Sequence, residues 1–119
     1  ITLDSDPSKR LHNSGTRTYS YDEAIDYINK AIKLYPEFAE AYYNRGNLMA
    51  ISGELPAAYD DYTRAIELDE ELGEAYYNRG LVQIYMKDTR KGCMDLSKAG
   101  ELGIAAAYDL LREFHIAEH

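Results

Sequence analysis

The heptapeptide Glu40-Ala41-Tyr42-Tyr43-Asn44-Arg45-Gly46 returns unchanged at residues 74–80, an offset of 34 residues. Seven identical residues at a fixed offset have a random expectation on the order of one in a billion, so they indicate an internal repeat. The offset extends in both directions: Asp61, Ala65, Glu67 and Leu68 correspond to Asp95, Ala99, Glu101 and Leu102, and Ala24, Asp26, Ala31, Ile32 and Leu34 correspond to Ala58, Asp60, Ala65, Ile66 and Leu68. Three units therefore share one frame.

Within this frame the apolar residues recur at helical spacing. Ser20-Tyr21-Asp22-Glu23 has the pattern of a capping box, in which the Ser and Glu side chains satisfy free backbone N–H groups at the start of a helix. The helix ends at Tyr35-Pro36, and its apolar face consists of Tyr21, Ala24, Ile25, Ile28, Ala31, Ile32 and Tyr35. Further helices are predicted over about residues 37–52, 55–69 and 73–86, from beyond Lys87-Asp88 to Leu102, and from Ile104 to about Ala117, with a turn at Gly53.

A period of 34 residues built from two helices resembles the tetratricopeptide repeat. Ala41 to Gly46 resembles the first half of that motif, and Ala58, Tyr62 and Ala65, continuing to Asp69, resemble the second. The resemblance implies an all-α fold, an α-solenoid of antiparallel helix pairs, in one domain over residues 1–119. Its expected parts are an irregular segment or short helix (1–19), the second helix of a partial repeat (20–36), two repeats (37–70 and 71–103) and a capping helix (104–119).

Small residues are expected where paired helices approach closely, because helices about 8 to 10 Å apart leave no room for a large side chain at the contact. The pairs are Gly46 with Ala58 and Gly80 with Gly92, and the structural repeat positions are Gly46, Ala58, Ala65, Gly80, Gly92 and Ala99. Gly92 and Gly100 inside a helix each cost up to about 1 kcal/mol relative to Ala, so we expect the final helix to pack against them. That helix has an apolar side with Ala107, Leu110, Leu111 and Phe114 and a polar side with Asp109, Arg112, Glu113 and Glu118, as a solenoid cap requires.

Residues 1–19 carry the weakest pattern. Asp6-Pro7 could start a short helix that runs to about Asn13 and stops at Gly15. In the 34-residue frame His12 stands where Gly46 and Gly80 make their close approach. Either this segment packs differently from the first helix of a repeat, or the true first helix precedes Ile1.

Composition restricts the partners. The formal net charge of −8 argues against DNA, RNA or an anionic membrane, whose recognition requires a basic face. No apolar run approaches the roughly 20 residues that a membrane-spanning helix needs, so direct membrane insertion is not expected. The chain starts at Ile1 and not at Met, which suggests a processed or truncated N-terminus and leaves cytoplasmic and exported locations both open.

Residues for catalysis are sparse. His12, His115 and His119 are the three histidines, and neither a nucleophile setting nor a Gly-rich phosphate loop occurs. His115 and His119 could share a metal, but we interpret them as the end of a frayed helix, and the acidic cluster at residues 67–74 as a solvated helix junction because it lacks a calcium-loop pattern. Cys93 is predicted to pack on an apolar face. No enzyme activity, metal or cofactor is therefore predicted.

Arg45 and Arg79 each stand beside a packing glycine, where the family more often has an apolar residue. They are either hooks for an anion or partners of acidic residues on neighbouring second helices, namely Asp26, Asp60 or Asp61. The second interpretation is favoured.

The resemblance implies a concave groove lined by the first helices of the repeats, which would hold a peptide or a helix of a partner protein. Carried over by position, the groove residues are Tyr43, Asn44, Asn47, Ala50, Ile51, Tyr77, Asn78, Leu81, Ile84 and Tyr85. Amides can hold an extended backbone, and tyrosines give contact area at low entropic cost. Members of the family that bind chaperones hold an acidic tail with lysines, which Tyr43 and Tyr77 replace, so an acidic tail is not the expected ligand.

The predicted function is therefore a non-catalytic scaffold for protein–protein interaction. The alternative is a fragment of a longer repeat array with a structural or self-assembly role. A homodimer through the helix at residues 21–35 is also expected, because the preceding residues are a poor cover for its apolar stripe and a two-fold contact could supply one. The alternative is that residues before Ile1 supply this cover.

Overall fold

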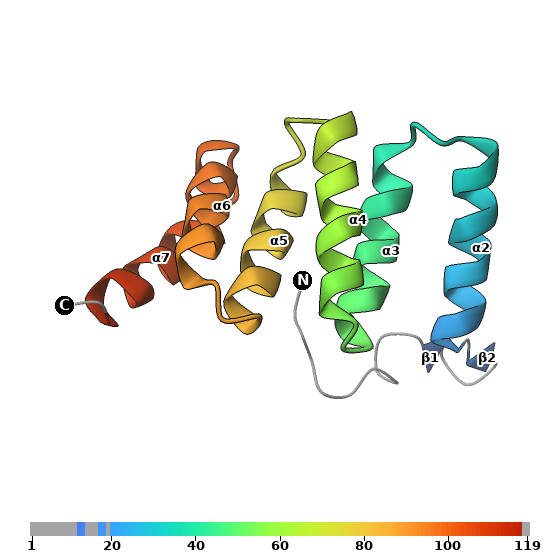
Figure 1. The fold of residues 1–119 in the computed structure, drawn as a ribbon, viewed down its shortest axis with the longest axis horizontal. Coiled ribbons are helices and arrows are strands. Elements are labelled where there is room, and N and C mark those ends of the chain that lie inside the picture. Colours follow the sequence, from blue (N-terminus) through green and yellow to red (C-terminus); the bar gives the residue numbers. More distant parts are fainter. Residues whose placement is uncertain (1–11, 14–16, 19, 118–119) are drawn as a thin grey trace.

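The computed structural model describes residues 12–13, 17–18 and 20–117 and is dominated by six helices (Figure 1). Strands β1 (His12–Asn13) and β2 (Arg17–Thr18) come first. The helices are α2 (Tyr21–Leu34), α3 (Ala39–Ile51), α4 (Leu55–Leu68), α5 (Gly73–Tyr85), α6 (Thr89–Glu101) and α7 (Ala105–Ala117). All six predicted helices are confirmed, with ends shifted by no more than about two residues, the usual uncertainty of helix boundaries.

The helices form a row of antiparallel pairs that runs from α2 at one end to α7 at the other (Figure 1). Each helix packs on its neighbours in sequence, and the most extensive contacts are those of α3 with α4 and of α5 with α6. α3 also touches α5, so the first helices of successive pairs lie in one layer, while α4 and α6 belong to the other. The fold is therefore all-α with the helix-pair architecture that the repeat predicted.

The prediction of a helix from Asp6-Pro7 to about Asn13 is wrong for its last two residues, which form a strand. His12 pairs with Thr18 and Asn13 with Arg17 in a short antiparallel ribbon at the base of α2 (Figure 1). Residues 1–11 lie outside the described part of the chain. At His12, which stands at the position of Gly46 in the repeat frame, the chain forms a strand and not a helix. The alternative in which this segment packs differently from a repeat helix is the one observed for these four residues.

Local signals fix the helix ends. Ser20 caps α2, because its side chain accepts a hydrogen bond from the Glu23 backbone N–H at 3.1 Å. Pro56 lies in the first turn of α4, where its missing N–H is not needed. Gly53 follows α3 with φ +86°, a conformation that glycine adopts without steric cost.

The core consists of three apolar clusters between successive helices. The first joins Ala50 and Val82 to α4, the second joins α4 to Ala75, and the third joins α6 to Ala107 on α7. Tyr62 at the centre of α4 has no exposed surface, and its ring lies 5.9 Å from that of Tyr43. The two complete pairs α3–α4 and α5–α6 thus hold most of the interior.

Glycines allow the paired helices to meet. A Cβ atom on Gly46 would lie 2.8 Å from the ring of Tyr62, one helical turn after the predicted neighbour Ala58, so the Tyr62 ring is the part of α4 nearest to this glycine. A Cβ on Gly80 would lie 2.8 Å from the Gly92 carbonyl oxygen, which confirms that predicted pair. Gly92 packs against α5, so the expectation that the final helix covers it is wrong.

Helix α7 covers the last pair. A Cβ on Gly100 would lie 2.6 Å from the Tyr108 ring, so for this glycine the expected contact with the final helix is confirmed. Ala107 is buried, and Leu110, Leu111 and Phe114 pack against the same cluster. The predicted polar side is confirmed for Asp109, Arg112 and Glu113, which are exposed, while Glu118 lies outside the described residues. The result is a terminal helix with an apolar inner face and a charged outer face.

We expect Gly80→Ala to lower the free energy of unfolding by about 1 to 3 kcal/mol, the range typical of overpacking. Even one methyl group collides here, because its neighbour is the Gly92 backbone, which cannot rotate away as a side chain could. Urea unfolding followed by circular dichroism measures the effect. Ser97→Ala at an exposed site of α6 is the control and should change stability little. Equal stability of Gly80→Ala and wild type would contradict the assigned crossing.

Candidate functional site

Two arginines cross-link the helices in the same way in both complete pairs. Arg45 donates two hydrogen bonds to the Asp61 carboxylate, Nε to Oδ2 at 2.9 Å and Nη2 to Oδ1 at 2.7 Å. Its Nη1 donates to Asn29 Oδ1 on α2 at 2.8 Å. The guanidinium of Arg45 therefore links α3 to both α4 and α2.

Arg79 repeats this arrangement one unit later. It donates to both oxygens of Asp95, at 2.7 and 2.9 Å, and to Thr63 Oγ1 on α4 at 3.2 Å. Gln83 also donates to Asp95, and the Arg79 guanidinium lies 5.7 Å from the ring centres of Tyr59 and Tyr76. The hydrogen bond with Asp95, opposed by burial, raises the pKa of Arg79 above its ordinary value.

The favoured structural interpretation of the arginines is therefore confirmed, with a correction to the partners. Asp61 pairs with Arg45 as predicted, whereas Arg79 pairs with Asp95, which was not among the predicted partners. Each arginine reaches the aspartate 16 residues later in its own pair, because that residue lies directly across the helix crossing. Asp26 and Asp60 are exposed on other faces of their helices.

The predicted groove residues lie on α3 and α5. We call the exposed part of this surface the α3–α5 face; its members are Tyr43, Asn44, Asn47, Ile51, Tyr77, Leu81 and Tyr85, all exposed or partly exposed. Three other predicted residues differ. Asn78 and Ala50 are buried in the interior, and Ile84 is partly exposed but packs against Gly92 in the third cluster, so these three side chains support the face from below.

A chain of hydrogen bonds fixes the polar groups of the α3–α5 face. Asn78 Nδ2 donates to the Tyr43 hydroxyl at 3.1 Å and to Asn47 Oδ1 at 2.9 Å. The Tyr62 hydroxyl donates to the same Asn47 oxygen at 2.6 Å. Burial raises the pKa of Tyr62 well above its ordinary value, so this donor keeps its proton at any physiological pH. The buried groups thus hold Tyr43 and Asn47 in fixed orientations.

Helix α7 brings an acidic residue to the edge of this face. Asp109 is the fifth residue of α7, as Tyr43 and Tyr77 are of α3 and α5. Burial and then the nearby Asp109 carboxylate raise the pKa of Tyr77. Sequence reasoning placed Asp109 on the polar side of the final helix and did not assign it to this face. The reason is that α6 and the connection before α7 are each one residue shorter than α4 and the connection before α5, which breaks the 34-residue frame. Counting from the observed start of α7 at Ala105, and not from the repeat, gives the equivalence of Asp109 with Tyr77.

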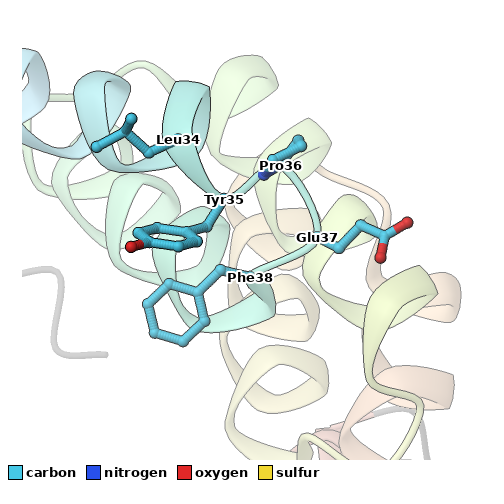
Figure 2. Close-up of a pocket in the computed structure, with 5 residues that line it drawn as sticks. All are labelled: Leu34, Tyr35, Pro36, Glu37 and Phe38. Carbon is cyan, nitrogen blue, oxygen red and sulfur yellow. The ribbon is translucent and has the colours of Figure 1, made fainter.

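A further pocket, of about 640 Å³, lies at the junction of α2 and α3 and was not predicted (Figure 2). Tyr35 and Phe38 extend to the same side of the connecting loop, while Glu37 points away from them (Figure 2). Phe38 corresponds to Leu72, which packs against the second cluster, whereas Phe38 remains 48% exposed. The sequence contains a signal for this pocket, because Phe38 is an aromatic residue where the next repeat has a leucine.

Among the residues that the structure describes, no group of three or more potential metal ligands occurs. The side chain of His115 and the whole of His119 lie outside those residues, so the interpretation of this end as a frayed helix stays a prediction. Cys93 is partly buried on α6. Among the described helices, none has the length and apolar character needed to cross a membrane.

Comparison with known proteins identifies related folds. Residues 27–60 match a family model described as tetratricopeptide repeat. The structure titled as the first TPR of Spaghetti (RPAP3) bound to the HSP90 peptide SRMEEVD is 25% identical, with a TM-score of 0.76 over 82% of this chain and 79% of that one. A search of curated proteins found no match.

Two further solved structures share the architecture over longer chains. MamA is 31% identical with a TM-score of 0.73, and the alignment covers 76% of this chain and 54% of MamA. YrrB, described as a TPR protein with an unusual peptide-binding site, is 24% identical with a TM-score of 0.71 over 77% of this chain and 48% of YrrB. At that identity the likeness to YrrB concerns the fold alone.

Arg79→Lys should lower the free energy of unfolding by about 1 to 3 kcal/mol, because lysine cannot donate to both Asp95 oxygens and Thr63 from one planar group. Thermal and urea unfolding measure the loss. Arg64→Lys is the matched control and should change stability by less than about 0.5 kcal/mol. Arg64 makes a single, exposed ion pair of 3.4 Å with Glu67 and lies 5.8 Å from the Tyr42 ring centre, a contact that a lysine ammonium can also make. Equal effects of the two substitutions would contradict the structural role of Arg79.

Proposed function

Since the chain is a tetratricopeptide repeat protein, we propose that it binds an extended peptide segment of a partner protein on the α3–α5 face. Domains of this family are typically modules of protein–protein interaction and are generally non-catalytic. The similar TPR domain of Spaghetti (RPAP3) was solved with a bound peptide, which supports peptide binding by a fold of this kind.

The observation that carries the proposal is the fixed set of hydrogen-bonding groups on the α3–α5 face. The Tyr43 oxygen accepts from Asn78, so its own O–H can still donate outward. Asn47 Oδ1 accepts from both Tyr62 and Asn78, which turns its amide nitrogen away from them. These two donors suit the carbonyl groups of an extended peptide, and Tyr77, Leu81 and Tyr85 supply apolar contact area beside them.

The charges around the face support a neutral or basic peptide. Glu40 and Glu74 are exposed in the first turns of α3 and α5, and Asp109 lies beside Tyr77. The arginines of α3 and α5 are held by Asp61 and Asp95 and offer little positive charge to a ligand. The acidic peptide SRMEEVD in the RPAP3 structure counts against this preference, because a related fold accepts such a tail.

Selection from a random heptapeptide library tests both parts of the proposal. Enriched peptides should have a net charge of zero or above, and they should bind more tightly than SRMEEVD in fluorescence anisotropy. Tyr77→Ala should weaken their binding about tenfold or more, the usual effect of losing a central aromatic contact. Circular dichroism would verify that the variant remains folded.

Tyr27→Ala on α2 provides the control, because it removes an exposed tyrosine outside the α3–α5 face and should leave peptide affinity unchanged. Tightest binding by acidic peptides would overturn the charge preference. Undiminished binding by folded Tyr77→Ala would overturn the assigned face.

A further inference from the structure

Among the described residues, one side of α2 lacks the covering helix that packs on the corresponding side of α4. The positions Ala58, Asp61, Tyr62 and Ala65 of α4 are 0 to 7% exposed, because α3 packs on them through Gly46 and Arg45. Their counterparts in the repeat frame are Ala24, Tyr27, Ile28 and Ala31, and α2 has no buried residue at all. We call these four residues, together with Leu34 and Tyr35, the open face of α2.

The open face is strongly apolar. Tyr27 is 64% exposed and Leu34 is 73% exposed, values high for residues of this size. The face continues into the pocket formed by Tyr35 and Phe38 (Figure 2). Within the described part of the chain no helix precedes α2, and His12–Asn13 and Arg17–Thr18 form a ribbon instead.

The chemistry of the open face differs from that of a standard pairing within this chain. At the crossing in the two complete pairs, Asp61 and Asp95 hold an arginine of the preceding helix. Tyr27 occupies the corresponding position of α2 and cannot hold a guanidinium by two hydrogen bonds. If a helix with the sequence pattern of α3 or α5 packed on this face, its arginine would have no carboxylate partner. We therefore expect the helix that covers the open face to have a different sequence pattern.

The charges of α2 are segregated along its length. Asp22, Glu23 and Asp26 lie in its first half, and Lys30 and Lys33 lie in its second half. A second α2 in antiparallel orientation places acidic residues opposite basic ones at both ends, whereas a parallel one opposes like charges. We propose that the open face binds the open face of a second copy of this chain through a two-fold antiparallel contact of the α2 helices.

The helix geometry supports this contact. With residues 100° apart around a helix, Ala24 and Ala31 lie at the centre of the open face, one small residue in each half, which allows close approach. Glu23 and Lys30 border the same edge of that face, and both are exposed. Two-fold symmetry brings Glu23 of one copy to Lys30 of the second copy and repeats the pair in reverse, on either side of Tyr27.

Sedimentation equilibrium of the 119-residue chain, alone and as charge variants, tests the proposal. Wild type should show a monomer–dimer equilibrium. Glu23→Lys and Lys30→Glu should each raise the dimer dissociation constant about tenfold or more, because each puts like charges together twice. An equimolar mixture of the two variants should restore association, since a mixed dimer contains only opposite-charge pairs. Lys98→Glu, the same charge change on exposed α6, should have no effect.

A concentration-independent monomer would overturn the proposal and assign the open face to another partner or to residues before α2. A dimer that both charge variants leave intact, or one that mixing does not restore, would also overturn it. Peptide binding distinguishes this result from the proposed function, because the α3–α5 face belongs to other helices. Peptide affinity should remain unchanged in the charge variants even where the dimer is lost.

Discussion

The close approach of paired helices at Gly46 and Gly80 is the constraint on which the structure depends. A side chain at Gly80 would meet the Gly92 backbone, and one at Gly46 would meet the buried Tyr62 ring. Only at this separation can Arg45 and Arg79 reach aspartates across the crossing with two hydrogen bonds each. The same approach buries Tyr62, whose hydroxyl then orients Asn47 on the outer surface. Packing and the candidate binding surface are thus parts of one arrangement.

The two ends of the helix row differ in how they are closed. α7 covers the last pair and turns Asp109, Arg112 and Glu113 outward, so that end has a polar surface. α2 presents an apolar surface instead, with Tyr27 and Leu34 exposed. The α7 end therefore presents a charged surface, while the α2 end presents an apolar surface suited to further contact.

Much of this arrangement was predictable from the sequence, because a 34-residue frame carries α3 and α4 onto α5 and α6, Gly46 onto Gly80, and Asp61 onto Asp95. The frame fails where the chain departs from it. α6 and the connection before α7 are each one residue shorter than their counterparts, which moved Asp109 out of register, and β1 at residues 12–13 lies where the end of a helix was predicted. The burial of individual residues could not be predicted from the repeat. Asn78 has the same sequence context as Asn44, yet Asn78 is buried and Asn44 is exposed. The reason is that only Asn78 has a complete preceding pair, α3 and α4, packed beside it. A sequence pattern names equivalent positions but not the neighbours that bury them.

Hydrogen exchange followed helix by helix in dilute protein tests most directly whether the glycine crossings organise the fold. The account predicts slow exchange in α3, α4, α5 and α6, which meet at the crossings, and exchange in α2 that is about tenfold faster or more, because α2 has no buried residue. Protection of α2 equal to that of α4 in the dilute monomer would contradict the account, since stability would then not depend on the paired crossings.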